Sequence, residues 1–177
     1  MIEIVQAGQA GKTSLLFDMH RLRARVFKDK LGWDVSVDDR GLEVDEFDIP
    51  DAVYLLALNG AGRVIGSWRL LSSTGPTMIR SLWPQYLDTL PMPVSENVWE
   101  VSRFSVDSPL PDHDAAAREM QEAVGKMFCA LTELCLAMNI REIHTLYDAR
   151  IAKVIQRLDC QPFKTSATLP INDEPCQ

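Results

Sequence analysis

The apolar residues of this chain change their spacing along the sequence, and this change limits the folds that the chain can adopt. In residues 14–30 they recur every three or four positions, which predicts a helix. Residues 53–58 and 63–71 are apolar runs on either side of a Gly-containing turn and predict a β-hairpin. Residues 98–106 predict a third core strand.

The second half of the chain alternates between helix and strand. Residues 114–138 carry an amphipathic helical stripe, and residues 140–146 predict a strand. Asp148 then suits the N-cap of a further helix, and residues 163–169 could form a last strand. Together with a weak first strand at residues 1–5, this order predicts a mixed sheet covered by helices.

Length, charge and cysteine usage exclude several classes of protein. A chain of 177 residues predicts one domain with a real core. The net charge of −7 argues against nucleic acid as a partner. The sequence has no apolar run long enough for a membrane span, and its N-terminus lacks the pattern of a signal peptide. We therefore expect a cytoplasmic protein.

Cysteine and histidine spacing indicates no metal site. The four cysteines form no Cys-x-x-Cys pair, so we expect reduced, mostly buried thiols. The three histidines lie far apart in the sequence and match no ligand spacing.

Polar and aromatic residues in the first 103 positions point to a binding pocket. Arg23 and Phe27 are four residues apart in the predicted helix and share a face. Glu100 and Ser102 lie on one side of a strand. A cation beside an aromatic ring, with several carboxylates, suits a zwitterionic ligand. The further members of this set are Trp33, Asp45, Asp48, Arg69 and Arg103.

The segments that carry these residues read HRLRARVFKDKLGWDV, EVDEFD, GSWRLL and WEVSRFSV. Together they resemble the N-acyl-homoserine lactone synthases, the LuxI-type autoinducer synthases of bacterial quorum sensing, over roughly residues 2–165. The resemblance implies an acetyltransferase-like (GNAT-like) three-layer α/β/α sandwich. It also implies an acyltransferase that moves an acyl chain from acyl carrier protein to the amine of S-adenosylmethionine. Lactonisation then releases methylthioadenosine.

The resemblance assigns the polar set to S-adenosylmethionine, a co-substrate, with no tightly bound cofactor and no metal. Arginine suits its carboxylate, Trp33 suits its sulfonium, and Asp45 and Asp48 suit its ammonium. Glu100 would be the general base, and Ser102, on the same side of the strand, would be the second catalytic residue. Arg69 and Arg103 could instead support the acidic loop. In a regular strand Arg103 would point away from Glu100.

The resemblance also implies an acyl pocket and a docking surface. Phe104, Thr145 and Leu146 would line an apolar tunnel, and a threonine there resembles members that use 3-oxo-acyl chains. An acidic carrier protein needs a local basic patch on this acidic chain. Four residues near the C-terminus could supply it, or could form a solvated helix face: Arg150, Lys153, Arg157 and Lys164.

Other interpretations remain open. Residues 6–13 resemble a phosphate-binding loop, but Gln6 stands where its first glycine is required, so we expect a turn that leads into a helix. An ordinary acetyltransferase using coenzyme A would need glycines before its central helix, and FSVDSPLPDHDAAAR has none. The family also continues past the point where this sequence stops, at INDEPCQ, with a strand that closes the acyl pocket. An inactive module that binds the carrier protein or the co-substrate is therefore a further alternative.

Overall fold

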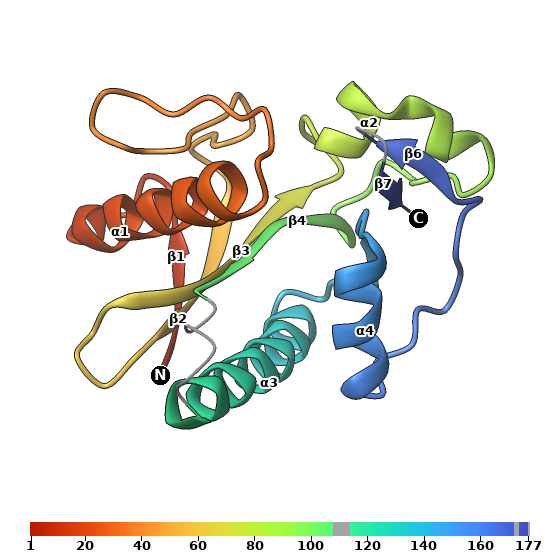
Figure 1. Cartoon of the computed structure of the whole chain (residues 1–177). Coiled ribbons are helices and arrows are strands. Elements are labelled where there is room, and N and C mark those ends of the chain that lie inside the picture. The colour runs from red at the N-terminus through yellow and green to blue at the C-terminus, as the bar shows by residue number, and fades with distance from the viewer. Residues whose placement is uncertain (108–113, 172–173, 177) are drawn as a thin grey trace.

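A five-stranded mixed sheet forms the centre of the computed structural model, which describes residues 1–107, 114–171 and 174–176 (Figure 1). The strand order is β1-β2-β3-β4-β5. Neighbours from β1 to β4 are antiparallel, and β4 and β5 are parallel. The strands are β1 Ile2–Gln6, β2 Val53–Leu58, β3 Val64–Ser72, β4 Val98–Val106 and β5 Glu142–His144.

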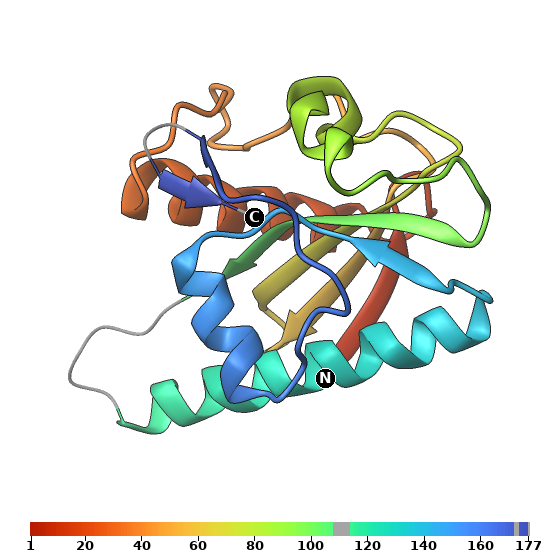
Figure 2. The same ribbon diagram turned by 90° about the vertical axis from the view of Figure 1, so that its right-hand side faces the viewer.

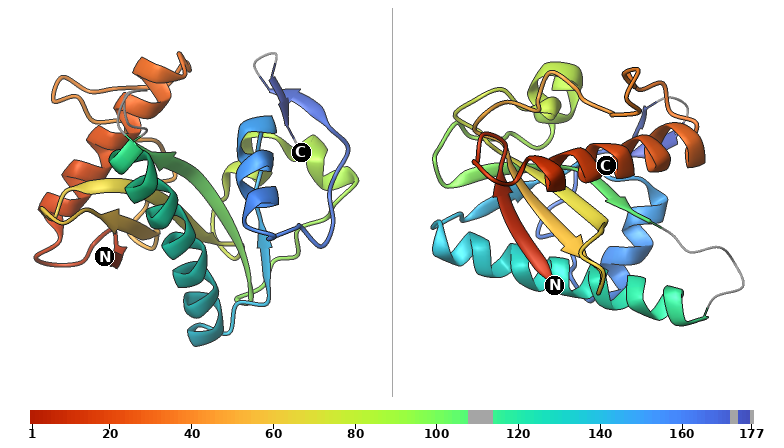
Figure 3. Two further views of the ribbon diagram at one scale, coloured as in Figure 1. Left: turned by 60° about the horizontal axis from the view of Figure 1, so that its bottom comes forward. Right: turned by 90° about the vertical axis from the view of Figure 1, so that its left-hand side faces the viewer.

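Helices cover both faces of the sheet. Helix α1 (Thr13–Arg23) continues as the π-helical segment η1 (Ala24–Lys30) and covers one face. Helix α3 (Asp114–Ala137) covers the other (Figure 3). The side chains of β2 alternate between these two layers: Tyr54 and Leu56 pack with the α1 core, and Leu55 and Ala57 with the α3 core. The predicted three-layer arrangement is confirmed.

Helix α3 approaches the sheet closely at Gly66. A Cβ atom on Gly66 would lie 2.9 Å from Sδ of Met127, which has no exposed surface. A side chain at this position would therefore collide with Met127, and glycine lets the helix pack directly on β3. The residues before α3, 108–113, lie outside the described residues, and they include part of the glycine-free stretch noted above.

The C-terminal half differs from the prediction in its strands. Strand β5 is only three residues long and pairs only with Val98, Trp99 and Glu100 of β4. No strand forms over residues 163–168, which are mostly exposed and follow an irregular path (Figure 2). Instead, β6 (Leu169–Ile171) begins where the predicted strand ends and pairs with β7 (Glu174–Cys176).

Shorter elements complete the C-terminal half. Helix α4 (Ala149–Arg157) begins at Asp148, whose carboxylate accepts the N–H groups of Arg150 and Ile151, so the predicted N-cap is confirmed. Helix α2 (Met78–Leu82) and the 3₁₀ turn η2 (Pro84–Asp88) lie near β6 and β7 (Figure 1). The Tyr86 hydroxyl donates to the Leu169 carbonyl oxygen at 2.8 Å.

A β-bulge interrupts β4. Arg69 faces Ser102 across the β3–β4 pair and Ser67 faces Ser105, so residues 103 and 104 together oppose the single residue 68. Arg103 has a φ of 56°, in the left-handed region. The bulge turns Arg103 toward the α1 face, where Ser102 and Arg69 also lie, so the prediction that Arg103 points away from Glu100 is wrong.

The turn before α1 and the cysteine side chains were also predicted from the sequence. The stretch that resembles a phosphate-binding loop forms a turn before α1, as expected. The four cysteines form no disulfide, but Cys129 and Cys160 are exposed and the other two are half-buried, so the expectation of mostly buried thiols is wrong. In the described part of the chain, no helix has the length and apolar character needed to cross a bilayer.

Candidate active site

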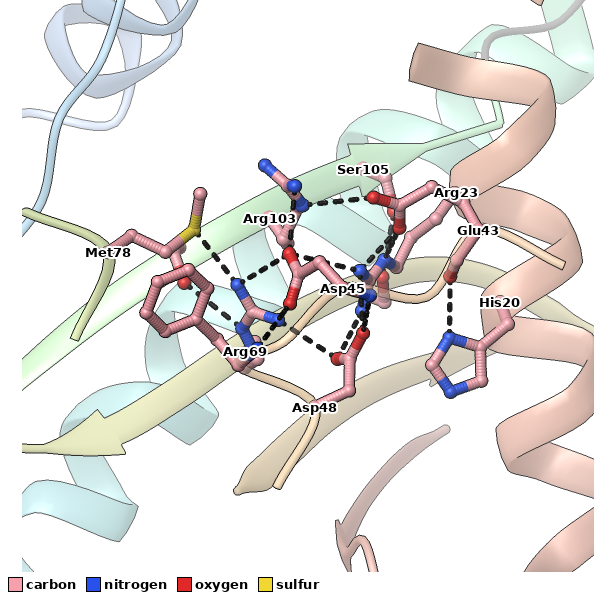
Figure 4. Close-up of polar contacts among 12 residues, drawn as sticks. His20, Arg23, Glu43, Asp45, Asp48, Arg69, Met78, Arg103 and Ser105 are labelled. Carbon is pink, nitrogen blue, oxygen red and sulfur yellow. Dashed lines mark hydrogen bonds and ion pairs between the residues drawn. The ribbon is translucent and has the colours of Figure 1, made fainter. Parts of the chain in front are cut away.

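Three arginines and three carboxylates form one ionic cluster on the α1 face of the sheet (Figure 4). The arginines come from three elements: the end of α1, the middle of β3 and the bulge of β4. The carboxylates come from the loop between η1 and β2. We call this set, namely Arg23, Arg69, Arg103, Glu43, Asp45 and Asp48, the ionic cluster.

Arg23 lies at the base of the cluster and has no exposed surface. Its terminal nitrogens donate to the two carboxylate oxygens of Asp48 at 2.7 and 3.0 Å. Its Nε donates to Oε2 of Glu43. Burial opposes the charge of Arg23, but Asp48 and Glu43 outweigh that effect and raise its pKa above the ordinary value. The charge of Arg23 is therefore balanced by carboxylates of the protein itself.

Arg69 links the cluster to strand β4 and helix α2. One terminal nitrogen donates to Asp45 and, at 3.0 Å, to Oδ1 of Asp48. Its Nε donates to the hydroxyl of Ser102 at 3.3 Å, and its other terminal nitrogen lies 2.9 Å from Sδ of Met78. The expectation that a buried arginine here supports the acidic loop agrees with these contacts.

Arg103 and Asp45 form the more accessible edge of the cluster. Their side chains are 13% and 17% exposed, compared with 0% for Arg23 and 3% for Asp48. Arg103 donates to Oδ2 of Asp45 at 2.8 Å, and its Nε lies 3.2 Å from Oε1 of Glu43. A ligand would therefore meet Arg103 and Asp45 before it met the rest of the cluster.

Two aromatic rings lie beside this edge. The rings of Phe27 and Trp33 are stacked, with centroids 5.1 Å apart and an interplanar angle of 4°. The guanidinium carbon of Arg103 lies 5.5 Å from the centroid of Phe27. The π-helical geometry of η1 and the turn at Gly32, whose φ is 66°, bring Trp33 back over Phe27. Phe27 is buried and Trp33 is half-buried.

The formal charges of the ionic cluster cancel, and the arginines favour the ionised form of Asp45 and Asp48. Burial alone would raise the pKa of Asp48, but the charges of Arg23 and Arg69 outweigh it, so the pKa lies below the ordinary value of 3.8. Arg69 and Arg103 lower the pKa of Asp45 below 3.8 in the same way against the effect of burial.

These lowered pKa values predict how stability depends on pH. A carboxylate whose pKa is lower in the folded than in the unfolded state stabilises the fold above the unfolded value, and this contribution disappears as the pH falls through the folded value. We therefore expect the free energy of unfolding, measured by urea titration, to fall steadily below about pH 3.8. The pKa of Glu100 is raised, so its contribution to stability depends on pH in the opposite direction. Glu100 takes up its proton above pH 3.8. Constant stability down to pH 2 would contradict the prediction.

Glu100 caps the N-terminus of α2 and is almost fully buried. Its Oε1 accepts the N–H of Met78 at 3.1 Å, and its Oε2 accepts the N–H of Ile79 at 2.7 Å. Burial raises the pKa of Glu100, and the N–H groups of Ile79 and Met78 oppose that rise. A carboxylate with a raised pKa on the same face as the ionic cluster can accept a proton from a bound amine.

The expected acyl-pocket residues do not all lie with the cluster. Because of the bulge, Phe104 lies on the α3 face, where its ring centroid is 5.0 Å from that of Trp68. Thr145 and Leu146 are half-buried in the segment between β5 and α4. Phe104 and the ionic cluster thus lie on opposite faces of the sheet.

The predicted docking residues lie on and after helix α4. Arg150, Lys153 and Arg157 are exposed and follow the three- and four-residue spacing of one helix face. The Nε of Arg150 donates to Asp148 at 2.7 Å, so part of its charge is used locally. Lys164 is exposed beyond the helix, with Nζ 5.6 Å from the centroid of the Phe163 ring.

Glu43 and Tyr54 also contact the arginines and carboxylates of the cluster, and neither was predicted from the sequence. Glu43 contacts both Arg23 and Arg103 and has about 1% of its surface exposed. The Tyr54 hydroxyl donates to Asp48 at 2.8 Å. Glu43 is the first residue of the segment EVDEFD, which the resemblance had already indicated. Spacing alone does not show which acidic residue of that segment is buried. In the described residues, no group of three His, Cys, Asp or Glu side chains could hold a metal ion.

Comparison with known proteins identifies the family. The profile of the family described as "Autoinducer synthase" matches residues 9–172. An acyl-homoserine-lactone synthase from Rhizobium radiobacter is 40% identical over 146 residues, which cover 82% of this chain and 68% of that protein. This chain belongs to the autoinducer synthase family. The expected enzyme class, an acyltransferase of the acyl-homoserine-lactone synthase type, is thereby confirmed.

Solved structures agree with this assignment of the autoinducer synthase. The structure of the acyl-homoserine-lactone synthase LasI has a TM-score of 0.79 at 30% identity and covers 99% of this chain and 86% of its own. BjaI, described as a coenzyme A-dependent synthase in complex with S-adenosylmethionine and isopentyl-coenzyme A, has a TM-score of 0.79 at 24% identity, with coverages of 99% and 80%. A Lactobacillus plantarum protein described as an N-acetyltransferase shares the fold alone, with a TM-score of 0.60 at 13% identity and coverages of 99% and 93%. The predicted acetyltransferase-like fold is confirmed.

Proposed function

We propose that this synthase transfers an acyl chain from a thioester to the amine of S-adenosylmethionine and then closes the homoserine lactone. The observation that carries the proposal is the accessible edge of the ionic cluster. Arg103 and Asp45 present one cation and one anion beside the Phe27–Trp33 stack, on the face that also holds Glu100. The BjaI complex with S-adenosylmethionine supports this choice of co-substrate.

The parts of this edge match the charges of S-adenosylmethionine. Arg103 would bind its carboxylate, Asp45 its ammonium and the Trp33 ring its sulfonium. Phe27 would hold the Trp33 ring in place through the stack. We assign Arg23, Asp48 and Arg69 to positioning, because their charged groups are buried within the cluster.

In the first reaction, Glu100 would accept a proton from the ammonium, directly or through a water molecule, because an ammonium has no lone pair with which to attack. The amine nitrogen then bonds to the thioester carbon, the carbon–sulfur bond breaks, and the thiolate leaves with a second proton from nitrogen. Backbone N–H groups at the bulge of β4 are suited to stabilise the oxyanion, since residues 103 and 104 together face only one residue of β3. Ser102 would help to hold Arg69 in register through its hydroxyl.

In the second reaction, the carboxylate of the acylated co-substrate attacks the carbon next to sulfur. The carbon–sulfonium bond breaks and neutral methylthioadenosine leaves. The sulfonium is already a good leaving group, so this step requires little acid or base assistance from the protein.

The acyl chain would pass from the cluster face toward Phe104. Strand β5 pairs only with the first three residues of β4, so the later part of β4 has no strand partner on its β5 side among the described residues. An acyl chain placed there would reach Phe104 and Trp68 on the α3 face. Thr145 and Leu146 follow β5 and would line its other side, with the Thr145 hydroxyl available to a 3-oxo group.

Acyl carrier protein is the donor that we propose, docked on the basic face of α4. The overall charge of −7 repels an acidic partner, so a local basic surface has to supply the attraction. The relative BjaI is described as coenzyme A-dependent, which makes coenzyme A thioesters the donor to compare.

Reversing two charges of this face tests the donor. In Lys153→Glu/Arg157→Glu, we expect a higher KM for acyl carrier protein and a weaker dependence of KM on salt, because surface charges mainly set the association rate. Both residues are exposed and, unlike Arg150, lie beyond the first turn of α4, which the N-cap residue Asp148 holds. The KM for S-adenosylmethionine should stay unchanged. If the variant used the carrier-bound substrate as well as the parent, the basic face would be only a solvated helix surface.

The experiment that tests the overall proposal supplies the purified protein with S-adenosylmethionine and acyl thioesters of carrier protein or coenzyme A. Release of methylthioadenosine together with lactone, measured by mass spectrometry, supports the synthase. Binding of S-adenosylmethionine without turnover would support an inactive binding module. An acylated product made from other amines, without methylthioadenosine, would indicate a general N-acyltransferase.

A further inference from the structure

Helix α2 has two groups that can cap its N-terminus, and only one of them is bonded. Thr77 occupies the N-cap position, with φ −131° and ψ 150°. Its side chain is buried, and its Oγ1 makes no hydrogen bond with any part of the described chain. A threonine at an N-cap normally accepts an N–H from the second or third residue of the helix, here Ile79 or Arg80.

Glu100 takes the place of this bond. Its carboxylate accepts the N–H groups of Met78 and Ile79 from the neighbouring strand β4. Thr77 contributes only its carbonyl oxygen, which accepts the N–H of Ser81 at 3.1 Å. A buried hydroxyl without a partner destabilises the state in which it occurs. The unbonded Thr77 hydroxyl therefore lowers the stability of the resting enzyme.

Helix α2 is also held by contacts that do not involve Glu100. The guanidinium of Arg80 donates to the carbonyl oxygens of Ser73 and Met92 at 3.0 and 3.2 Å. On the other side, Arg69 contacts Sδ of Met78 at 2.9 Å. If the Glu100 carboxylate turned away, these contacts would keep the first turn of α2 next to Thr77.

We propose that Thr77 is a positioning residue that takes over the cap of α2 when Glu100 turns toward the substrate. In this exchange the Glu100 carboxylate turns away and the Thr77 side chain rotates, after which the hydroxyl accepts the N–H of Ile79 or Arg80. It leaves the helix capped in both states and frees both carboxylate oxygens of Glu100. A carboxylate released from two N–H donors is a stronger base. This inference rests on the proposed role of Glu100 as the general base.

Thr77→Val tests the inference, because valine keeps the shape and removes the hydroxyl. We expect kcat to fall about tenfold, the factor given by about 1.4 kcal/mol of lost transition-state stabilisation, which lies within the range of an N-cap. The KM for S-adenosylmethionine should be unchanged. The melting temperature should stay the same or rise, because the resting enzyme loses only an unpaired hydroxyl. Thr77→Ser should keep kcat close to that of the parent.

Two controls separate this role from a purely structural one. Thr74→Val removes a hydroxyl three residues earlier in the same loop, whose 2.8 Å hydrogen bond with the Ser72 hydroxyl is exposed, and should change neither kcat nor melting temperature. If Thr77 only supported the fold, Thr77→Val would lower the melting temperature. Unchanged kcat in Thr77→Val, or a loss that Thr77→Ser does not restore, would overturn the inference.

A double-mutant comparison links Thr77 to Glu100. In the Glu100→Gln background, Thr77→Val should cause no further loss of turnover, since the base that it assists is already gone. A full tenfold loss in that background would show that Thr77 acts by another route and overturn the inference. Near-parental turnover of Glu100→Gln alone would instead reject Glu100 as the base. The two failures are therefore distinguishable.

Discussion

Glu100→Gln is expected to lower turnover by about 100-fold or more, because a carboxamide cannot take the proton that the ammonium has to lose before it attacks as an amine. The substitution also affects the cap of α2. Only one of the two positions that accept N–H groups from Met78 and Ile79 remains an acceptor. We therefore also expect a loss of about 1–3 kcal/mol in the free energy of unfolding. Steady-state release of methylthioadenosine measures the first effect, and urea titration measures the second.

The affinity for S-adenosylmethionine separates loss of the base from damage to the site. Calorimetry should give nearly the parental affinity in the folded variant, because Arg103, Asp45 and Trp33 are unchanged. Glu142→Gln is a matched control, since Glu142 is an exposed residue of the neighbouring strand β5 and glutamine keeps an oxygen for its 2.8 Å contact with Nε2 of His144. It should behave like the parent in both assays. Turnover of Glu100→Gln within a few-fold of the parent would remove Glu100 from the mechanism.

Asp48→Asn should cause the largest loss of stability, about 3–5 kcal/mol in the free energy of unfolding. Asp48 accepts two hydrogen bonds from Arg23 and one each from Arg69, the Tyr54 hydroxyl and the Asp45 N–H. Asparagine has nearly the same shape, but it carries no charge and has only one acceptor atom. The buried guanidinium groups of Arg23 and Arg69 would then lack one of the negative charges that neutralise them, and this would destabilise the fold.

Asp34→Asn provides the control for this change. Asp34 is fully exposed, and its nearest cation, Nζ of Lys28, lies at 4.0 Å. Its replacement should alter the free energy of unfolding by no more than about 0.5 kcal/mol. If urea titration showed Asp48→Asn to be as stable as Asp34→Asn, the ionic cluster would not be the stabilising element that its burial indicates.

Regular apolar spacing made most of the sheet predictable from the sequence. The hairpin of β2 and β3 and the bounds of β4 follow from runs whose side chains fill two cores. The short strands near the C-terminus were harder to predict. Strand β5 ends after three residues because its pairing with β4 ends there, and this depends on the path of both chains rather than on composition.

Most residues of the ionic cluster could be named from the sequence, but Glu43 and the geometry of the cluster could not. The sequence identified Arg23, Asp48 and Arg69, but it did not show that they neutralise one another. The direction of Arg103 was wrong because one bulge breaks the alternation of β4. Glu100 contacts two residues of α2 that lie 22 and 21 positions before it in the sequence. A local sequence pattern cannot predict a contact over that separation.

The exact cancellation of charge in the ionic cluster restricts the routes by which this site can change during evolution. A single substitution that removes one charge leaves a buried charge of opposite sign without a partner. Most variants with only one such substitution would therefore fold poorly. Paired replacements that remove an arginine and a carboxylate together keep the balance. Variation in substrate preference should therefore arise first at Trp33, Phe104 and Thr145, which lie outside the cluster and can each change alone.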